Sequence, residues 1–283
     1  LMKRLGYKPE QAGGVEAAAS TGGQIMPPLM GAGAFLIAEY TRVPYIEIVK
    51  VSILPAIMYF ATVYLFVHII AIKQGMKGMP ASELPSMREV MRTGWHFLVP
   101  LAVLVWLLAM HTSPMRVGFF AVISVVAVAV ARHLFWMFVF APRQGEPVTG
   151  AALREAAERG LHGLIHGLSL GARNAVAVSM ACAVAGIIVG VVGLTGLGLK
   201  FSSMMMAFSG GNIVLALLMV IIASLILGMG LPVTAAYIVL IVLVGPALTS
   251  EFGIPLLIAH LVVFWYSQDS NVTPPVALAG FAG

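Results

Sequence analysis

Two short stretches of this sequence place hydroxyl and amide side chains directly before a pair of prolines, in otherwise apolar surroundings. One runs from residue 19 to 28 and the other from residue 269 to 275. Proline removes a backbone donor and disfavours helix at the residue before it, so each stretch predicts a broken helix. Carbonyl and hydroxyl oxygens freed at such breaks suit a hard monovalent cation such as Na⁺, and half-helix N-termini suit an anion. The polar side chains are those of Ser20, Thr21, Gln24, Ser270, Asn271 and Thr273.

A third segment of this kind, Gly228 to Pro232, separates two apolar runs. Glycine and proline also simply kink membrane helices, and for one isolated break the two interpretations are about equal. Two matched breaks near the ends of the chain, together with a Gly-Pro tip, are typical of an internally repeated transporter. Irregular backbone at membrane depth is tolerated where protein buries it or water reaches it, so all three segments should converge on one polar site.

The composition requires a membrane environment. Of the 283 residues, 60% are hydrophobic and only 10% are charged, against about 25% charged in ordinary soluble domains. This excludes a soluble globular protein. The 16 Lys and Arg residues are scattered between apolar runs, which argues against nucleic-acid binding and fits the positive-inside rule. The single cysteine, Cys182, allows neither an intrachain disulfide nor a cysteine-based metal site.

The apolar runs predict an all-α polytopic membrane protein with discontinuous transmembrane helices. We expect a first discontinuous helix over residues 11–40 and a second over residues 254–283, the latter truncated. Residues 73–95 and 141–173 are polar enough to form cytoplasmic or interfacial connections. The remaining apolar runs lie at residues 51–72, 97–112, 117–140, 174–199, 212–227 and 235–248.

Basic residues predict the orientation of these runs. Taken alternately, the loops on one side carry 12 Lys and Arg residues and those on the other side carry four, so the 73–95 and 141–173 connections should be cytoplasmic. Residues 212–248 form a hairpin whose ends both stay outside. Its tip lacks the basic residues of the cytoplasmic loops, which favours a re-entrant hairpin with the tip inside the protein.

The ends of the chain indicate a piece of a longer protein. Residues 1–10 carry no initiator Met and no signal or lipidation motif, and only eight residues follow Pro275. Eight helical residues span about 12 Å, which is too short to cross a bilayer. We therefore expect a missing N-terminal part of the same membrane protein.

Three motifs of this chain closely resemble the membrane component of TRAP (tripartite ATP-independent periplasmic) transporters. They lie at residues 16–28, 227–237 and 270–279. The match looks like the TAXI branch, in which small and large membrane subunits are fused. It covers essentially residues 1–283 as the C-terminal portion of the large (DctM-like) subunit region. The small-subunit region and a first hairpin that should precede Leu1 are absent from this sequence.

The resemblance implies an inverted-repeat, elevator-type permease of the bacterial inner membrane. It would import an organic anion, such as a carboxylate or dicarboxylate, with Na⁺ as coupling ion and no other cofactor. A periplasmic TAXI-type solute-binding protein would deliver the solute. On these motifs the substrate would meet Ser20, Thr21, Gln24, Thr234 and Asn271. Two sodium sites would comprise Ser20, Gly22 and Gly23 at the first break, and Gly228, Gly230, Ser270, Asn271 and Thr273 at the second.

Other interpretations remain open. Asp269 could ligate or compensate Na⁺, or take a proton, and it could equally cap the following half-helix or meet water. A channel is the second hypothesis, because broken helices also occur in pores. An intramembrane enzyme, for example one pairing Ser20 with His260, would need a nucleophile motif or paired acids, and the sequence has neither; we expect no catalytic residues. His260 itself is better explained as a packing residue.

Overall fold

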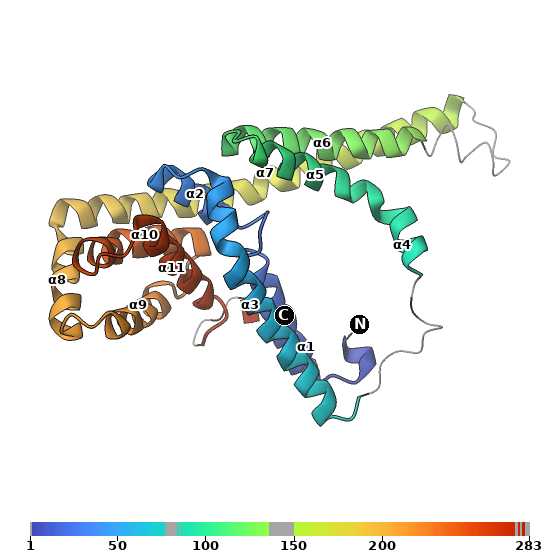
Figure 1. Ribbon diagram of the computed structural model, residues 1–283. Helices are drawn as coiled ribbons and strands as arrows, with labels where there is room; N and C mark the ends of the chain where they lie inside the picture. The colour runs from blue at the N-terminus through green and yellow to red at the C-terminus, as the bar shows by residue number, and fades with distance from the viewer. Residues whose placement is uncertain are drawn as a thin grey trace. The chain divides into compact units, whose positions relative to one another are not determined.

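The computed structural model describes residues 2–76, 84, 86–135, 150–274, 277, 279 and 280. These residues form helices joined by turns, and no β-strand occurs among them (Figure 1). The α-helices are α1 Pro9–Gly22, α2 Ala32–Thr41, α3 Tyr45–Lys73, α4 Met87–Gly94, α5 Leu98–Ala109, α6 Pro114–Phe135, α7 Gly150–Thr195, α8 Leu197–Ser209, α9 Ile213–Leu227, α10 Val233–Pro246 and α11 Leu256–Asp269. Shorter helical turns are η1 Met2–Leu5, η3 Trp95–Phe97 and the π-helical η6 Ala247–Glu251. The predicted all-α class is confirmed.

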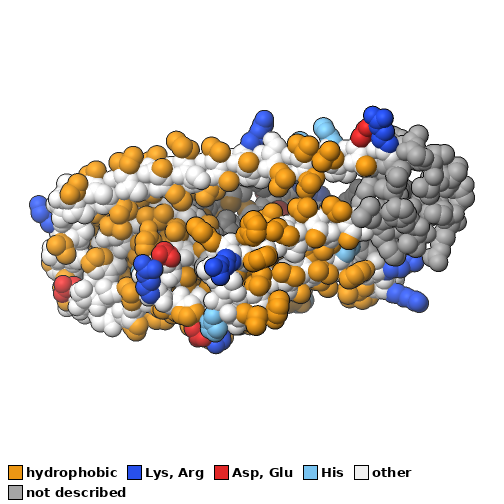
Figure 2. All heavy atoms as spheres, turned by 90° about the horizontal axis from the view of Figure 1, so that it is seen from above, with side chains coloured by type: hydrophobic (Ala, Val, Ile, Leu, Met, Phe, Trp, Pro, Cys, Tyr) orange, Lys and Arg blue, Asp and Glu red, His pale blue; other side chains and the backbone are white. Residues whose placement is uncertain are grey.

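Five of the described helices are long and apolar enough to cross a membrane. They are Tyr45–Lys73, Met87–Ala109, Met115–Arg132, Gly160–Thr195 and Val233–Glu251. Apolar side chains cover most of the described surface visible in Figure 2, with charged side chains scattered among them. Such a surface suits lipid rather than water, since exposed apolar patches of this extent are rare on soluble monomers. The chain is a multi-pass membrane protein.

The helices divide into two compact units, residues 1–80 with 178–283, and residues 81–177. In the second unit α5 packs against α6, and Arg132 lies 2.8 Å from the ring of His96. The first unit contains both predicted breaks and the predicted hairpin.

The first broken helix consists of α1 and α2. Helix α1 ends at Gly22 and α2 begins at Ala32, so the break that the glycine and proline pairs predict is confirmed. Between the helices the chain turns sharply: the Ile25 amide donates to the Gly22 carbonyl, and the Gly31 amide donates to the Gln24 carbonyl at 2.7 Å. These bonds satisfy part of the backbone that the break frees.

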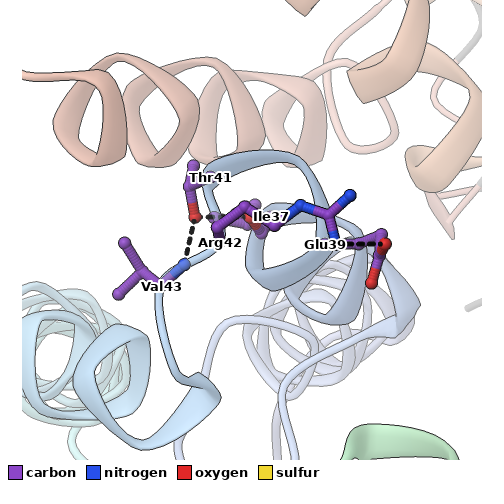
Figure 3. A network of polar contacts seen from close by, with 5 residues as sticks. All are labelled: Ile37, Glu39, Thr41, Arg42 and Val43. Carbon is purple, nitrogen blue, oxygen red and sulfur yellow. Dashed lines mark hydrogen bonds and ion pairs between the residues drawn. The ribbon is translucent and has the colours of Figure 1, made fainter.

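A compact corner ends α2 and leads into α3 (Figure 3). The Thr41 hydroxyl donates to the Ile37 carbonyl at 2.6 Å and accepts from the Val43 amide at 3.3 Å. Arg42 takes the left-handed backbone conformation, with φ of 57°, and its side chain pairs with Glu39 at 3.1 Å. The left-handed residue stops the helix, and Pro44 then leads directly into α3.

The C-terminal helices surround α10, whose residues are almost all buried. Helices α8, α9, α11 and α2 all contact it. At Gly198 the backbone of α8 approaches α10 so closely that a β-carbon would lie 3.0 Å from the Val242 carbonyl oxygen. Because protein rather than lipid encloses α10, irregular backbone at its start can be tolerated inside the molecule. Whether the 212–248 hairpin is re-entrant stays a prediction.

One predicted boundary is not found. The sequence indicated a helical, interfacial stretch up to residue 173 and a separate helix from 174, whereas one helix, α7, runs without interruption from Gly150 to Thr195. No proline lies between residues 148 and 231, and glycines alone weaken a helix without ending it. The part of the 141–173 prediction that covers residues 141–149 lies outside the described residues, as do residues 77–83 and 85 of the 73–95 connection.

The sequence analysis also missed two short elements. Helix α8 follows α7 after Gly196, which has φ of 65° and separates the two helices. The π-helical turn η6 follows Pro246 at the end of α10.

Candidate ion and substrate site

Helices α2 and α11 lie antiparallel, and this register positions the site. Gly33, near the start of α2, packs against the ring of Phe264, and a β-carbon at Gly33 would collide with that ring. Tyr40, near the end of α2, has its ring centroid 6.2 Å from that of His260. The N-terminus of α2 is therefore directed toward the C-terminal end of α11. The exit of the first break consequently lies beside the start of the second.

Helix α10 has the same antiparallel relation to α11. The Tyr237 hydroxyl lies 2.6 Å from Nδ1 of the buried His260, and the ring of Tyr237 packs edge-on against Phe264 at 5.8 Å. Further toward the start of α10, the hairpin tip reaches the second break: a β-carbon at Gly228 would collide with the Ser270 side chain. The structure thus brings together two of the predicted residues that are 42 positions apart in sequence.

The tip itself is a tight turn. The Leu231 amide donates to the Gly228 carbonyl at 3.2 Å, and Gly230 has φ of 73°, a conformation that favours glycine. A β-carbon at Gly230 would meet nothing within 4 Å. Gly230 therefore serves the turn, and the described contacts do not join it to Ser270, Asn271 or Thr273. Thr234 lies in the first turn of α10 and is half-buried.

Tyrosines of α3 hold the first break. The Tyr59 hydroxyl donates to the Ala18 carbonyl at 2.8 Å, and the Tyr45 hydroxyl donates to the Pro28 carbonyl at 3.1 Å. A β-carbon at Gly22 would collide with the Tyr59 ring, so α1 approaches α3 closely there. Tyr59 thereby links α3 to the end of α1.

The predicted residues of the first break differ in exposure. Thr21 and Gly22 are buried, whereas Ser20, Gly23 and Gln24 are exposed. The carbonyls of Ser20 and Thr21 accept turn hydrogen bonds from the amides of Gly23 and Gln24, both at 3.1 Å. A carbonyl oxygen has two lone pairs, so these oxygens retain one for a cation.

The hydroxyls of the second break are anchored to the helix that precedes them. Ser270 Oγ donates to the Ser267 carbonyl at 2.8 Å, and Thr273 Oγ1 donates to the Asp269 carbonyl at 2.6 Å. Each hydrogen bond uses the hydroxyl proton and leaves the oxygen lone pairs free. Both oxygens can therefore accept a hydrogen bond or coordinate Na⁺ in a fixed position. Asn271 completes this segment, with its backbone carbonyl accepting from the Ala279 amide at 3.0 Å.

Sequence reasoning missed Gln268. It lies in the last turn of α11 and is only 2% exposed, yet its side-chain oxygen and nitrogen have no hydrogen-bond partner among the described residues. The signal was present in the sequence, because Gln268 is a large polar residue directly before the predicted break and follows an apolar run. Tyr59, in contrast, gave no signal, since it is one aromatic residue among many in α3.

Two other predicted roles can be compared with the geometry. His260 is buried and bonds Tyr237, as expected of a packing histidine, and no hydrogen bond joins it to Ser20 among the described residues. The Asp269 side chain is exposed at the end of α11. Within the described part of the chain, no cluster of three or more His, Cys, Asp or Glu residues suits a metal ion.

The arrangement combines hard oxygen ligands with two helix N-termini, those of α2 and α10. Each N-terminus carries a partial positive charge and backbone amides without intrahelical partners. The oxygens favour a cation and the helix ends favour an anion. Sites of this kind are typical of secondary transporters with broken helices.

Comparisons with known proteins identify the family. The sequence model described as "Tripartite ATP-independent periplasmic transporter, DctM component" matches residues 1–283, the full length of this sequence. Comparison with curated proteins and comparison with solved structures gave no significant match. Components of this family are permeases, and they work with a periplasmic binding protein and a small membrane subunit. The chain belongs to the DctM family of TRAP transporters, as a permease component of a secondary transport system.

Proposed function

We propose that this permease couples the uptake of an organic anion to Na⁺. The observation that carries the proposal is the convergence of α2 and α10 on the end of α11, which directs two positive helix ends and several hard oxygens at one place. Of the known ways to drive a permease, a cation gradient fits these groups best. No Walker motif occurs in the sequence, so the chain itself offers no nucleotide site.

We place one proposed sodium site at each of the two helix breaks. One uses the oxygens of Ser20 with the backbone of Gly22 and Gly23. The second uses Ser270 and Thr273 with Asn271 and the tip glycines Gly228 and Gly230. The anion would lie between them, within reach of Thr21, Gln24 and Thr234. The contact of Gly228 with Ser270 and the anchored hydroxyls of Ser270 and Thr273 support the second site.

The proposed partner is a periplasmic solute-binding protein of the TAXI type. It would deliver a carboxylate or dicarboxylate to the permease in the bacterial inner membrane. The small and large membrane subunits would be fused in one chain, as in the TAXI branch. The motifs at residues 16–28, 227–237 and 270–279 support the TAXI assignment, because their match looks like that branch.

Transport in proteoliposomes tests this function. The complete permease is reconstituted and given its solute-loaded binding protein, under an inward Na⁺ gradient and without ATP. We expect concentrative uptake that requires both the gradient and the binding protein. Uptake that persists when choline replaces Na⁺ would contradict sodium coupling. Solute that only equilibrates and never accumulates above the external concentration would indicate a channel instead.

A further inference from the structure

Two amide side chains at the end of α11 have buried atoms without a hydrogen-bond partner among the described residues. Gln268 is 2% exposed, and neither its Nε2 nor its Oε1 makes a hydrogen bond within the described part of the chain. Nδ2 of Asn271 is likewise buried and unpaired there. Buried amides without a hydrogen-bond partner are rare in native proteins, since their desolvation is uncompensated. Two of them three residues apart indicate a ligand.

The position of Gln268 on α11 shows which part of the site it belongs to. His260, Phe264 and Gln268 are spaced by four residues and therefore share one helix face. His260 and Phe264 on that face contact Tyr237 of α10 and Gly33 of α2. One turn further along, Gln268 is at the level where α2 and α10 begin. Asn271 follows by three residues, beside the Ser270 that meets the hairpin tip.

The charges available to the site limit how it can hold an anion. Residues 9–41 and 201–283, which form both breaks and the hairpin, contain no Lys or Arg. Lys50 of α3 is exposed and pairs with Glu47 at 2.7 Å. An anion bound between these elements must rely on neutral donors. Helix N-termini supply backbone amides, and the side chains must supply the rest.

Side-chain nitrogens distinguish an anion from a cation as the partner. The two unpaired nitrogens, Nε2 of Gln268 and Nδ2 of Asn271, can only donate hydrogen bonds and cannot coordinate Na⁺. Two N–H donors separated by about one helical turn fit the two oxygens of a carboxylate. The unpaired Oε1 of Gln268 can accept from a hydroxyl or amide on the same ligand.

We propose that Gln268 and Asn271 form an amide pair that binds the carboxylate group of the transported anion. The inference rests on the proposed function, because it names the recognition of the anion at that same site. It adds Gln268, which no motif assigned, and it gives the Asn271 amide nitrogen a definite role. The N-termini of α2 and α10 supply the accompanying positive field.

Ligand-dependent stability of the purified permease tests the amide pair. The probes are succinate, a dicarboxylate, and succinamide, its neutral diamide of nearly the same shape. We expect succinate, and not succinamide, to raise the unfolding temperature of the wild-type protein. In Gln268→Met, which keeps the length but removes both polar atoms, we expect the succinate concentration for half-maximal stabilisation to rise at least tenfold. Gln268→Glu, which places a carboxylate there, should have the same effect.

A matched substitution controls for general damage. Gln74, at the exposed end of α3, donates to Gln11 at 2.8 Å, outside the site. Gln74→Met should leave the response to succinate unchanged. If Gln268→Met does not fold, Gln268→Glu and Asn271→Asp carry the test, since both are nearly isosteric with the native residue.

Three results would overturn the amide pair. One is a wild-type protein that succinate does not stabilise. Another is a full succinate response in the Gln268 variants, which would make the amide structural. The third is a Gln268→Glu protein in which the Na⁺ concentration for half-maximal stabilisation shifts while the corresponding succinate concentration stays the same. That result would make Gln268 an ion ligand. Sodium-driven uptake by the wild type is measured in a separate experiment. The hypothesis of sodium coupling and the hypothesis of the amide pair can therefore be rejected independently of each other.

Discussion

Hydroxyl groups at the second break are positioned by the backbone they follow. Thr273 Oγ1 donates to the Asp269 carbonyl, one helical turn back, and Ser270 Oγ donates to the Ser267 carbonyl. Back-bonding of this kind is common for Ser and Thr in helices and contributes little by itself. At a break it has a second effect, because it fixes the direction of the oxygen lone pairs. The hydroxyl oxygen then needs no rearrangement when a cation binds.

Thr273→Val tests whether this oxygen is a sodium ligand. Valine keeps the size and branching of threonine but removes the hydroxyl oxygen. We expect the Na⁺ concentration for half-maximal uptake to rise about tenfold, while the folded yield changes little. The measurement is the Na⁺ activation curve of the reconstituted transporter.

Thr62→Val is the matched control for that substitution. Thr62 Oγ1 also donates to the carbonyl four residues back, Met58, at 2.9 Å, but Thr62 is exposed on α3 and does not belong to the second break. This variant should keep the wild-type Na⁺ curve. If the two variants behave alike, the Thr273 hydroxyl is structural.

At the residue scale, the sequence could identify the breaks but not all the groups that surround them. Pro27, Pro28 and the glycine pair predicted where the first helix ends, because their effect on the backbone is local. Ser270 and Gly228 were predicted as residues of one site, and in the structure the two residues lie in contact. Tyr59 could not be predicted, because its bond to the Ala18 carbonyl depends on how α3 packs against α1.

Among the elements, α2 and α10 both run antiparallel to α11. This shared direction places their N-termini near the end of α11. Both start at a break and both are held against α11 by aromatic side chains. One close approach is between Gly33 and Phe264, where a β-carbon would collide with the ring. This contact fixes the height of α2 along α11. It therefore fixes where the start of α2 lies relative to the second break.

A double-mutant cycle tests the register of α2 on α11. Gly33→Ala adds a β-carbon against the Phe264 ring, and overpacking of this kind costs about 1–3 kcal/mol of stability. Phe264→Leu removes part of that ring and should relieve the collision. We expect the double variant to be more stable than the sum of the single changes predicts, as measured from unfolding midpoints in detergent. Strictly additive effects would show that the two residues are not in contact.

Helix α7 shows where a sequence pattern can mislead. The change from polar to apolar residues near 174 indicated a boundary between two helices, yet polarity does not break a helix. Only a change in backbone preference does so, and the sequence between Gly150 and Thr195 contains none stronger than isolated glycines. The breaks at Pro27 and Pro232 were predictable for the same reason, because proline acts on the backbone directly.

Spin-label distances test the continuity of α7 at the predicted boundary. In a Cys182→Ala background, cysteines at 160 and 176 flank that boundary, and cysteines at 178 and 194 form a pair of the same sequence separation beyond it. A continuous helix places the residues of each pair about 24 Å apart. We expect the two pairs to give the same narrow distance distribution. A shorter or broader distribution for the first pair alone would mean that the helix bends near residue 173.

For the whole molecule, the distribution of basic residues predicts an orientation in the membrane. Arg154 belongs to the side with 12 basic residues, and Lys200 to the side with four. Both side chains are exposed, so cysteines introduced there should be accessible to reagents.

Cysteine labelling in cells tests the orientation. In the Cys182→Ala background, a membrane-impermeant maleimide should label Lys200→Cys in intact spheroplasts and label Arg154→Cys only after lysis. The cysteine-free protein gives the background signal. The reverse labelling pattern would mean that the orientation of the chain in the membrane is opposite to the one proposed.

The two helix N-termini that meet at the end of α11 have a thermodynamic consequence for the whole transporter. Their partial positive charges raise the local potential, which opposes a cation until an anion neutralises it. The affinity of each solute should therefore depend on whether the other is bound. Such linkage is reciprocal. The factor by which the bound anion increases the affinity for Na⁺ equals the factor by which bound Na⁺ increases the affinity for the anion. Tight coupling between the two fluxes would then originate in the direction of two helices, without a dedicated gating residue.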